Sequence, residues 1–455
     1  MRGTSLTRSI HRRISALIAL MLAATMLPAT LAAADTVTTE DPTEAAAGWL
    51  VGALTDDPAV GTEFGPSTGT TIDVLFALAG VGVAADTQVA ITDWLTTQVG
   101  PYTRGEGFDA DDAAYAGATA KLILAIDVAQ RDPRDVAGDD LVAQLLGREI
   151  LDEADGLVGR FSDTGDFGDF STPLTQSLAL LALHRVDGVD PSPAAVAALV
   201  DAACPDGGFP SQFDDAADPD TCTSSVDTTG LAVQALTAVG ESAAADAGVT
   251  WLLAEQADDG SFTSADGVNT NSTGLAAAAF TLRSQPAAAE AAREWILGVQ
   301  DGPDSDSPGA IPFNTTDRGL VELATSQAIL GLVGADLATL SSAGSSTDVP
   351  VFAPVEAPVD EPDDTDGTDD TDGTDGTDDT PDAVDADADE GDGSDAADDG
   401  AEAVVDDTPE TPQPTGVDAG TSPSTNWLLV ASLMTGLVFL LLGLGLRLQL
   451  ARSRR

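Results

Sequence analysis

The sequence contains few of the residues that build metal centres and aromatic-lined cavities. Its 455 residues include two cysteines and two histidines, and aromatic residues make up only 4%. Zinc ions in proteins are held mainly by cysteine and histidine side chains. His184 is the only histidine outside the N-terminal segment, so the sequence predicts no metal site and implies no cofactor.

Basic residues are also scarce. Only 18 lysines and arginines oppose 76 acidic residues, which gives a formal net charge of −58. Residues 35–340 alone contain 49 acidic and 10 basic residues. A surface this negative repels nucleic acid, which is therefore excluded as a partner. High salt, divalent ions, and cationic or neutral ligands all fit it, and composition does not choose among them.

The two ends of the chain carry the patterns of export and membrane anchoring. Residues 1–34 contain four arginines, an apolar run and a final Ala-Ala-Ala, as a secretory signal peptide does. Residues 427–446 are free of charge and long enough to span a bilayer as one helix. A basic tail follows at 447–455. Basic residues stay cytoplasmic, so we expect a single-pass membrane protein with its bulk outside the cell.

The segment before the expected membrane helix is strongly acidic. Residues 341–426 contain 27 acidic residues and no lysine or arginine. Such a segment buries too little apolar surface to offset its ordering entropy, which predicts a disordered linker. Thr415-Gly416 resembles the end of a wall-sorting motif, which also precedes an apolar span and a basic tail. Covalent attachment to a cell wall is therefore a less favoured alternative to membrane anchoring.

The two cysteines, Cys204 and Cys222, lie in the part expected to be exported. An even pair in an oxidising compartment is most simply a disulfide. Closing a loop of this length contributes about 3 kcal/mol in the chain-entropy view.

One repeated unit organises residues 35–340. In its clearest copy, residues 251–256 predict an outer helix and 259–262 form an Asp-Gly-x-Phe turn. An Ala-rich inner helix follows at 274–282, with Ser272 and Thr273 as suitable N-cap residues. Neither helix buries its apolar surface alone, so the units must stack on one another.

Six copies of the unit are present. Trp49 and Trp94 lie 45 positions apart, and Trp251 and Trp295 lie 44 apart. The inner segments are nearly uncharged and are therefore expected to be buried on both sides. No polar capping repeat is evident, which favours a closed ring of six helical hairpins. The predicted inner helices are 71–79, 118–124, 174–183, 228–239, 274–282 and 324–332.

This repeat resembles that of the α/α toroids of terpenoid cyclases and protein prenyltransferases. Cobalamin carriers of the intrinsic factor and transcobalamin type share the architecture. The resemblance rests on Trp251, Gln256 and the Asp-Gly-x-Phe turn, covers about 300 residues, and is greatest for exported toroid proteins of actinobacteria. It implies an all-α, closed α/α toroid. These motif residues stabilise the fold and do not specify chemistry.

Class II terpene cyclases, which share this repeat, protonate an alkene with the middle aspartate of an Asp-x-Asp-Asp motif. Asp109, Asp111 and Asp112 match that pattern here. The family has the motif at the start of an inner helix, whereas the repeat register puts these residues upstream, in a loop. The scarcity of aromatics also argues against a carbocation-stabilising cavity. A solvated loop is the favoured interpretation, with catalysis as the alternative.

The starts of the inner helices supply the candidate binding residues. Asp227 or Thr228 is expected to cap its helix, or Asp227 lies at the mouth of a central cavity and contacts a ligand. Asn269 and Asn271 occupy similar places in the fifth repeat. Tyr115 could reach the interior, although core packing is its favoured role.

We therefore expect a membrane-tethered binding or adhesion module, with an unknown small molecule or surface ligand at the cavity mouth. One alternative is an isoprenoid enzyme that uses an aspartate as a general acid. Another is a structural spacer whose interior is filled by leucine and alanine. Isoprenoid and cobalamin are the ligands that the resemblance suggests. The chain offers no β domain after residue 340 to cover a corrinoid, which makes cobalamin the weaker of the two.

Overall fold

The computed structural model describes residues 36–353, except 64, 153–156, 217–219 and 266. Among these residues, no helix is both long and apolar enough to cross a membrane. The predicted signal peptide, membrane helix and basic tail lie outside the described residues, as does most of the acidic linker.

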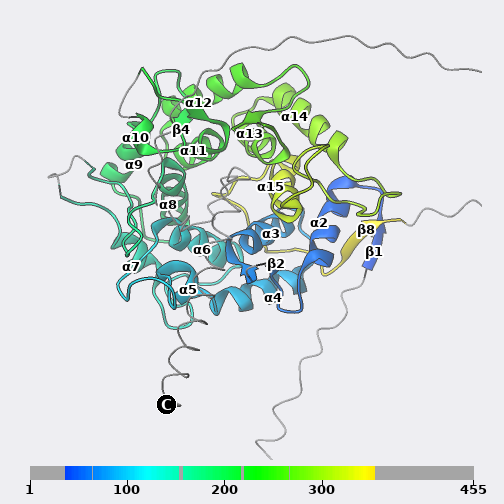
Figure 1. Ribbon diagram of the computed structural model, residues 1–455, viewed down its shortest axis with the longest axis horizontal. Coiled ribbons are helices and arrows are strands. Elements are labelled where there is room, and N and C mark those ends of the chain that lie inside the picture. Colours follow the sequence, from blue (N-terminus) through cyan, green and yellow to red (C-terminus); the bar gives the residue numbers. More distant parts are fainter. Residues whose placement is uncertain (1–35, 64, 153–156, 217–219, 266, 354–455) are drawn as a thin grey trace, which may run out of the picture. The chain divides into compact units, whose positions relative to one another are not determined.

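The described part is mostly helical and forms a ring with two layers (Figure 1). Each inner helix packs against the next, and α15 packs against α3, so the inner layer is closed. The inner helices are α3 (Thr68–Val81), α6 (Ala116–Val128), α8 (Pro173–Arg185), α11 (Val226–Ala238), α13 (Thr270–Leu282) and α15 (Val321–Val333).

The outer layer covers the inner one with a regular offset. The outer helices α12 and α14 pack chiefly on the inner helix that precedes them, α11 and α13. Helix α2 packs on α15, so the first repeat covers the last. The outer helices are α2 (Pro42–Ala53), α4 (Ala85–Thr96), α7 (Leu141–Leu146), α9 (Pro193–Val200), α12 (Ser242–Glu255) and α14 (Pro286–Val299). Two shorter helices are α5 (Val99–Arg104) and α10 (Phe213–Ala216).

Short strands connect the helices. Three small antiparallel hairpins precede inner helices: β2 (Val60–Thr62) with β3 (Gly65–Ser67), β4 (Phe209–Pro210) with β5 (Ser224–Ser225), and β6 (Thr263–Ser264) with β7 (Gly267–Val268). The first strand, β1 (Thr36–Thr39), pairs in parallel with the last, β8 (Val349–Phe352). Residues 349–352 were expected in the acidic linker, but they belong to the folded ring because they close this pair.

The glutamines of the Trp-x-x-x-x-Gln motif join neighbouring repeats. Gln256 Nε2 donates to the carbonyls of Gly260, in its own turn, and Ala288, in the next outer helix. Gln300 makes the same two bonds to Gly309 and Pro42, and the second of these spans the closure of the ring. The motif therefore fixes the turn of one repeat to the following outer helix.

The inner helices begin one to four residues earlier than predicted. The N-cap of α13 is Asn269, whose Oδ1 accepts a hydrogen bond from Ser272 N at 2.8 Å. The cap of α11 is Ser225, which accepts from Thr228 N. The expectations that residues 272–273 cap α13 and that Asp227 or Thr228 caps α11 are therefore wrong.

The far end of the inner ring is crossed by the chain that follows α15. Arg185 donates to the carbonyls of Leu337 and Leu340, both at 2.8 Å, and to Asp127. Gln234 accepts from the amide of Leu337 at 3.0 Å. These bonds fix the segment at the C-terminal ends of the inner helices, opposite the ends where the capped helices begin.

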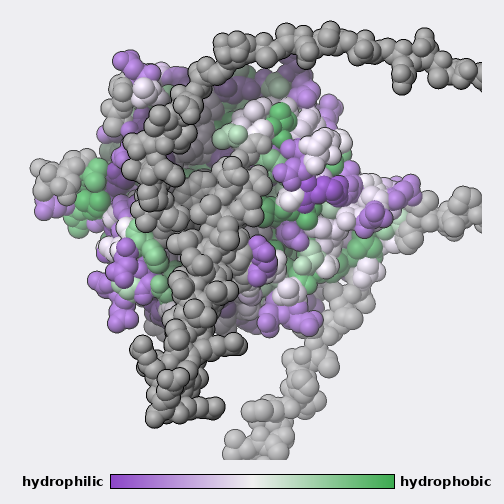
Figure 2. Space-filling view, viewed as in Figure 1, coloured by the Kyte–Doolittle hydropathy of each residue, from purple (hydrophilic) through white to green (hydrophobic). Residues whose placement is uncertain are grey.

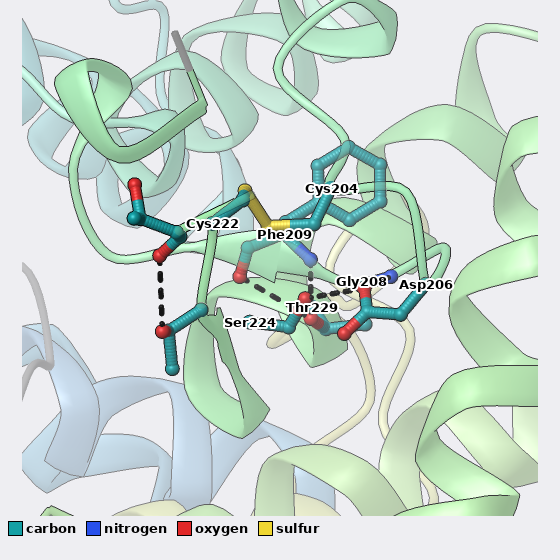
Figure 3. The surroundings of a disulfide bond; sticks show 9 residues. Cys204, Asp206, Gly208, Phe209, Cys222, Ser224 and Thr229 are labelled. Carbon is teal, nitrogen blue, oxygen red and sulfur yellow. Dashed lines mark hydrogen bonds between the residues drawn. A yellow bond between two sulfur atoms is a disulfide. The ribbon is translucent and has the colours of Figure 1, made fainter. Parts of the chain in front are cut away.

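The predicted disulfide is present. Cys204 and Cys222 are bonded across an 18-residue separation, and their Cα atoms lie 5.6 Å apart (Figure 3). The bond lies beside the β4–β5 hairpin, where Phe209 N donates to Thr229 Oγ1 at 2.8 Å. Asp206 holds the same turn by accepting from Gly208 N and Ser224 Oγ. The disulfide therefore closes a loop that carries α10.

Candidate functional site

The starts of five inner helices have an outward side that holds a turn. A threonine hydroxyl accepts the backbone amide of the preceding turn in four helices, and Gln176 does so in α8. Two residues along a helix correspond to a rotation of about 200°. Residues two positions before or after these acceptors therefore face the opposite way, toward the interior of the ring. The four threonines are Thr71, Thr229, Thr273 and Thr325.

The inward positions carry a chain of polar side chains across four helices. Lys121 Nζ of α6 lies 3.0 Å from Asp73 Oδ2 of α3, and both side chains are buried. Gln327 Nε2 of α15 approaches the same Asp73 oxygen at 3.5 Å. Asn271 of α13 donates through Nδ2 to Gln327 Oε1 at 3.0 Å. We call these four residues the inward polar chain.

Several buried polar atoms at this level have no hydrogen-bond partner among the described residues. They are Asn271 Oδ1, Ser272 Oγ and Thr228 Oγ1. Asn271 is 1% exposed, and Ser272 and Thr228 are fully buried. An unsatisfied buried polar group costs about 1–3 kcal/mol. Three such atoms at the starts of the adjacent helices α11 and α13 therefore call for a physical explanation.

The other inward positions are mostly apolar. In the same register lie five buried leucines, two of them on α13 and α15 together with Asn271 and Gln327, as well as two glycines and Asp227. No aromatic side chain occupies these two levels on any of the six inner helices. The interior thus carries polar and aliphatic side chains on the same helices. The leucines are Leu174, Leu178, Leu231, Leu275 and Leu323.

The structure places some of the predicted binding residues in the inward register and others in contacts that hold loops. Asp227 and Asn271 lie in the inward register, and both are buried. Thr228 also lies at this end of α11. Asn269 instead caps α13 and donates to Ser264 Oγ and Gly267 O, so it holds the β6–β7 hairpin. Tyr115 makes its hydroxyl bond to a surface loop rather than to the inward polar chain.

The Asp-x-Asp-Asp match lies in the loop between α5 and α6, as the repeat register predicts. Asp111 and Asp112 are exposed. Asp109 accepts from Tyr115 Oη at 2.5 Å and from the amides of Ala110 and Asp166. Burial tends to raise the pKa of Asp109, but these bonds hold it below its usual value. Burial and the bond to Asp109 raise the pKa of Tyr115. Asp109 is therefore an ionised anchor of the loop, a state unsuited to a general acid.

Sequence reasoning missed Asp163. This buried residue comes from the loop before α8, and its Oδ1 accepts the amide of Ala116, the first residue of α6, at 2.7 Å. Burial raises the pKa of Asp163 to about 6, although the Ala116 amide opposes the shift. Tyr115, the N-cap of α6, makes no side-chain capping bond. Asp163 therefore caps α6 from the next repeat.

Asp73 and Lys121 were also missed as site residues. The available signal was a charge within an otherwise uncharged inner segment. Lys121 is the only lysine in the chain. Among the described residues, no group of three or more histidine, cysteine or acidic side chains is arranged to hold a metal ion.

The fold matches known α/α toroids at low identity. Candida albicans protein geranylgeranyltransferase-I complexed with GGPP matches with 13% identity over 60% of this chain and 88% of that one, at a TM-score of 0.45. The type II terpene cyclase MstE from Scytonema matches with 14% identity over 66% and 98%, at 0.46. Haptocorrin in complex with Cbi matches with 16% identity over 70% and 74%, at 0.41. No protein-family model matches the sequence, and no curated protein matches it. The likeness is one of fold: an α/α toroid similar to those of terpenoid cyclases, protein prenyltransferases and haptocorrin.

Proposed function

We propose that this chain is a binding module that takes a small ligand into the interior of the helical ring, against the inward polar chain. The observation that carries the proposal is the set of unpartnered buried atoms, Asn271 Oδ1, Ser272 Oγ and Thr228 Oγ1. A ligand that donates to Asn271 and bonds to the two hydroxyls would remove the cost of leaving them unsatisfied.

The composition of the interior supports an amphipathic ligand. The inward positions offer amide and hydroxyl groups next to buried leucines. The Lys121 and Asp73 charges are paired with each other and leave no net charge between them. A neutral molecule with a polar edge and an aliphatic body fits these surroundings better than a strongly charged one.

The alternative functions receive less support. Acid catalysis on an isoprenoid requires a shielded carboxylic acid and aromatic walls, and the inward levels described above carry leucine instead. A spacer would have an interior filled with apolar side chains, which does not account for the inward polar chain. Display of the ring outside the cell, on a membrane helix at 427–446, remains a proposal supported by the sequence alone.

Native mass spectrometry of the full-length chain, purified from its own cell envelope, tests the binding proposal. We expect a co-purifying small molecule in the wild type and its loss in Asn271→Leu. The variant also removes the donor to the buried Gln327 Oε1, so we expect the free energy of unfolding to fall by about 1–3 kcal/mol while the fold is kept.

Thr273→Val is the matched control, because Thr273 lies on the same helix but faces outward. It should retain the small molecule. The absence of any bound molecule in the wild type, or equal retention by wild type and Asn271→Leu, would contradict the proposal and favour the spacer.

A further inference from the structure

Four junctions between repeats share one contact. In each, a turn glycine with positive φ faces the carbonyl of an alanine in the next outer helix. A Cβ on Gly260 would lie 2.2 Å from Ala291 O, so only glycine allows this approach. The contact therefore gives a common register for comparing the junctions. The pairs are Gly159 with Ala194, Gly207 with Ala247, Gly260 with Ala291, and Gly309 with Ala45.

Three of the four junctions combine a small residue with a tryptophan. The residue after the glycine is Gly208, Ser261 or Ala310, and four residues beyond the alanine the outer helix carries Trp251, Trp295 or Trp49. At the first of these junctions the two positions touch. A Cβ on Gly208 would lie 2.8 Å from Cδ2 of Trp251.

The junction between the third and fourth repeats reverses this pairing. The residue after Gly159 is Arg160, and the position of the tryptophan is occupied by Ala198. Losing the indole at this place leaves a pocket of about 380 Å³ beside α9, lined by Arg160, Ala198, Ala202 and Phe213 among others.

Arg160 is charged and lacks a polar partner in this pocket. Its Nε atom is buried without a hydrogen-bond partner among the described residues. Of the described arginines, Arg160 alone has a side chain that makes neither an ion pair nor a hydrogen bond to a described residue. Its Cζ lies 3.8 Å from the ring centroid of Phe213. Burial lowers the pKa of Arg160 while Asp169 and Asp214 raise it, and a guanidinium stays protonated at neutral pH.

Both walls of the pocket are held from elsewhere in the fold. Gln176 of α8 accepts from Phe161 N and donates to the carbonyls of Gly159 and Ala195, which fixes the backbone on either side of Arg160. Phe213 begins α10, inside the loop that the Cys204–Cys222 disulfide closes. The backbone that carries Arg160 is therefore held in place, as a binding site requires.

We propose that this pocket binds a small organic carboxylate whose flat apolar body takes the place of the missing indole. A guanidinium forms two parallel hydrogen bonds with a carboxylate, which would satisfy the buried Nε. The alanines of α9 and the Phe213 ring would contact the apolar body. Asp201 in the lining, and Asp169 and Asp214, which act on Arg160, are all exposed, so solvent screens their repulsion of an anion. This site is separate from the ring interior.

Binding of indole-3-acetate to the full-length chain, followed by isothermal titration calorimetry, tests the proposal. We expect saturable binding that weakens about tenfold in Arg160→Gln and about as much when indole-3-acetamide replaces the acid, since each change removes a charge-assisted bond. Ala198→Trp should abolish binding by restoring the residue that the other junctions use. If the tryptophan variant does not fold, Ala198→Leu provides the test. Its smaller side chain fills part of the pocket and should weaken binding.

Arg148→Gln is the charge-matched control. Arg148 is in the same repeat, bonds to Thr164 and Gly147, and does not line the pocket, so its loss should leave the affinity unchanged. The proposal is overturned if the wild type shows no saturable binding, if a folded Ala198→Trp binds as the wild type does, or if both arginine variants lose affinity equally.

Discussion

The outward and inward sides of the inner-helix starts follow opposite rules. On the outward side four of the six repeats use the same contact, a threonine that accepts a turn amide. On the inward side the residues in equivalent register differ from helix to helix, as Asp73, Lys121 and Gln327 do. The outward positions therefore recur from repeat to repeat, whereas the inward positions differ between repeats.

The reason lies in the geometry of a closed ring. In five repeats the turn amide is held by an acceptor on the inner helix of the same repeat, so the same contact recurs. The interior instead receives side chains from six helices at once. One helix can contribute a cation and its neighbour the anion, so the inward positions need not repeat.

The largest effect is expected from breaking the inward ion pair. Lys121→Met leaves Asp73 buried without its cation, and removing one partner of a buried pair typically costs about 3–5 kcal/mol. Urea denaturation of the variant and the wild type measures this loss. Gln327, which lies 3.5 Å from the same Asp73 oxygen, is too weakly placed to compensate.

The double variant Lys121→Met/Asp73→Leu separates charge from packing. It removes both charges, so most of the lost stability should return. If the double variant is no more stable than Lys121→Met, the packing of the lysine stem rather than the ion pair holds the two helices together.

A smaller effect is expected from the ionisation of Asp163, which caps α6. Its pKa is about 6 in the folded protein and 3.8 in the reference state, so between these values the folded chain holds a proton that the unfolded chain has lost. The contribution of Asp163 to stability is complete below about pH 4 and is lost as the pH rises through 6. The loss is about 3 kcal/mol.

Comparison with Asp163→Asn isolates this contribution from the other carboxylates. The asparagine keeps an oxygen for the Ala116 amide and does not ionise. We expect it to be more stable than the wild type at pH 7.5 and about equal at pH 4, by thermal denaturation at both values. A difference that does not depend on pH would mean that Asp163 does not titrate in this range.

The fold was largely predictable from sequence because its signal is local and repeated. Uncharged inner segments and tryptophan spacing located all six helix pairs. The helix starts were less accurate, since Ser272-Thr273 and Asn269 are all good capping residues. Only the hairpin that binds the Asn269 amide nitrogen distinguishes them. The Asp109 loop was placed correctly by register alone.

The interior was less predictable because its contacts join distant repeats. Lys121 and Asp73 are 48 residues apart, and Asn271 and Gln327 are 56 apart. A sequence pattern marks each residue as unusual for a buried helix but does not pair it with its partner. The Arg160 pocket likewise depends on Ala198, which occupies the position of a tryptophan in other repeats. The glycine contacts of the folded chain establish this correspondence.

The smallest expected effect tests whether the outward threonines contribute to stability by holding the turns. Thr273→Val removes the hydroxyl that accepts Phe262 N at 3.0 Å and donates to Asn269 O, and it leaves a buried amide unsatisfied. We expect a loss of about 1–2 kcal/mol in the free energy of unfolding. Thr281→Val, an exposed change on the same helix that also removes a backbone bond, should cost less than about 0.5 kcal/mol. Equal losses in the two variants would show that threonine's own helix bond, rather than its hold on the turn, explains its recurrence.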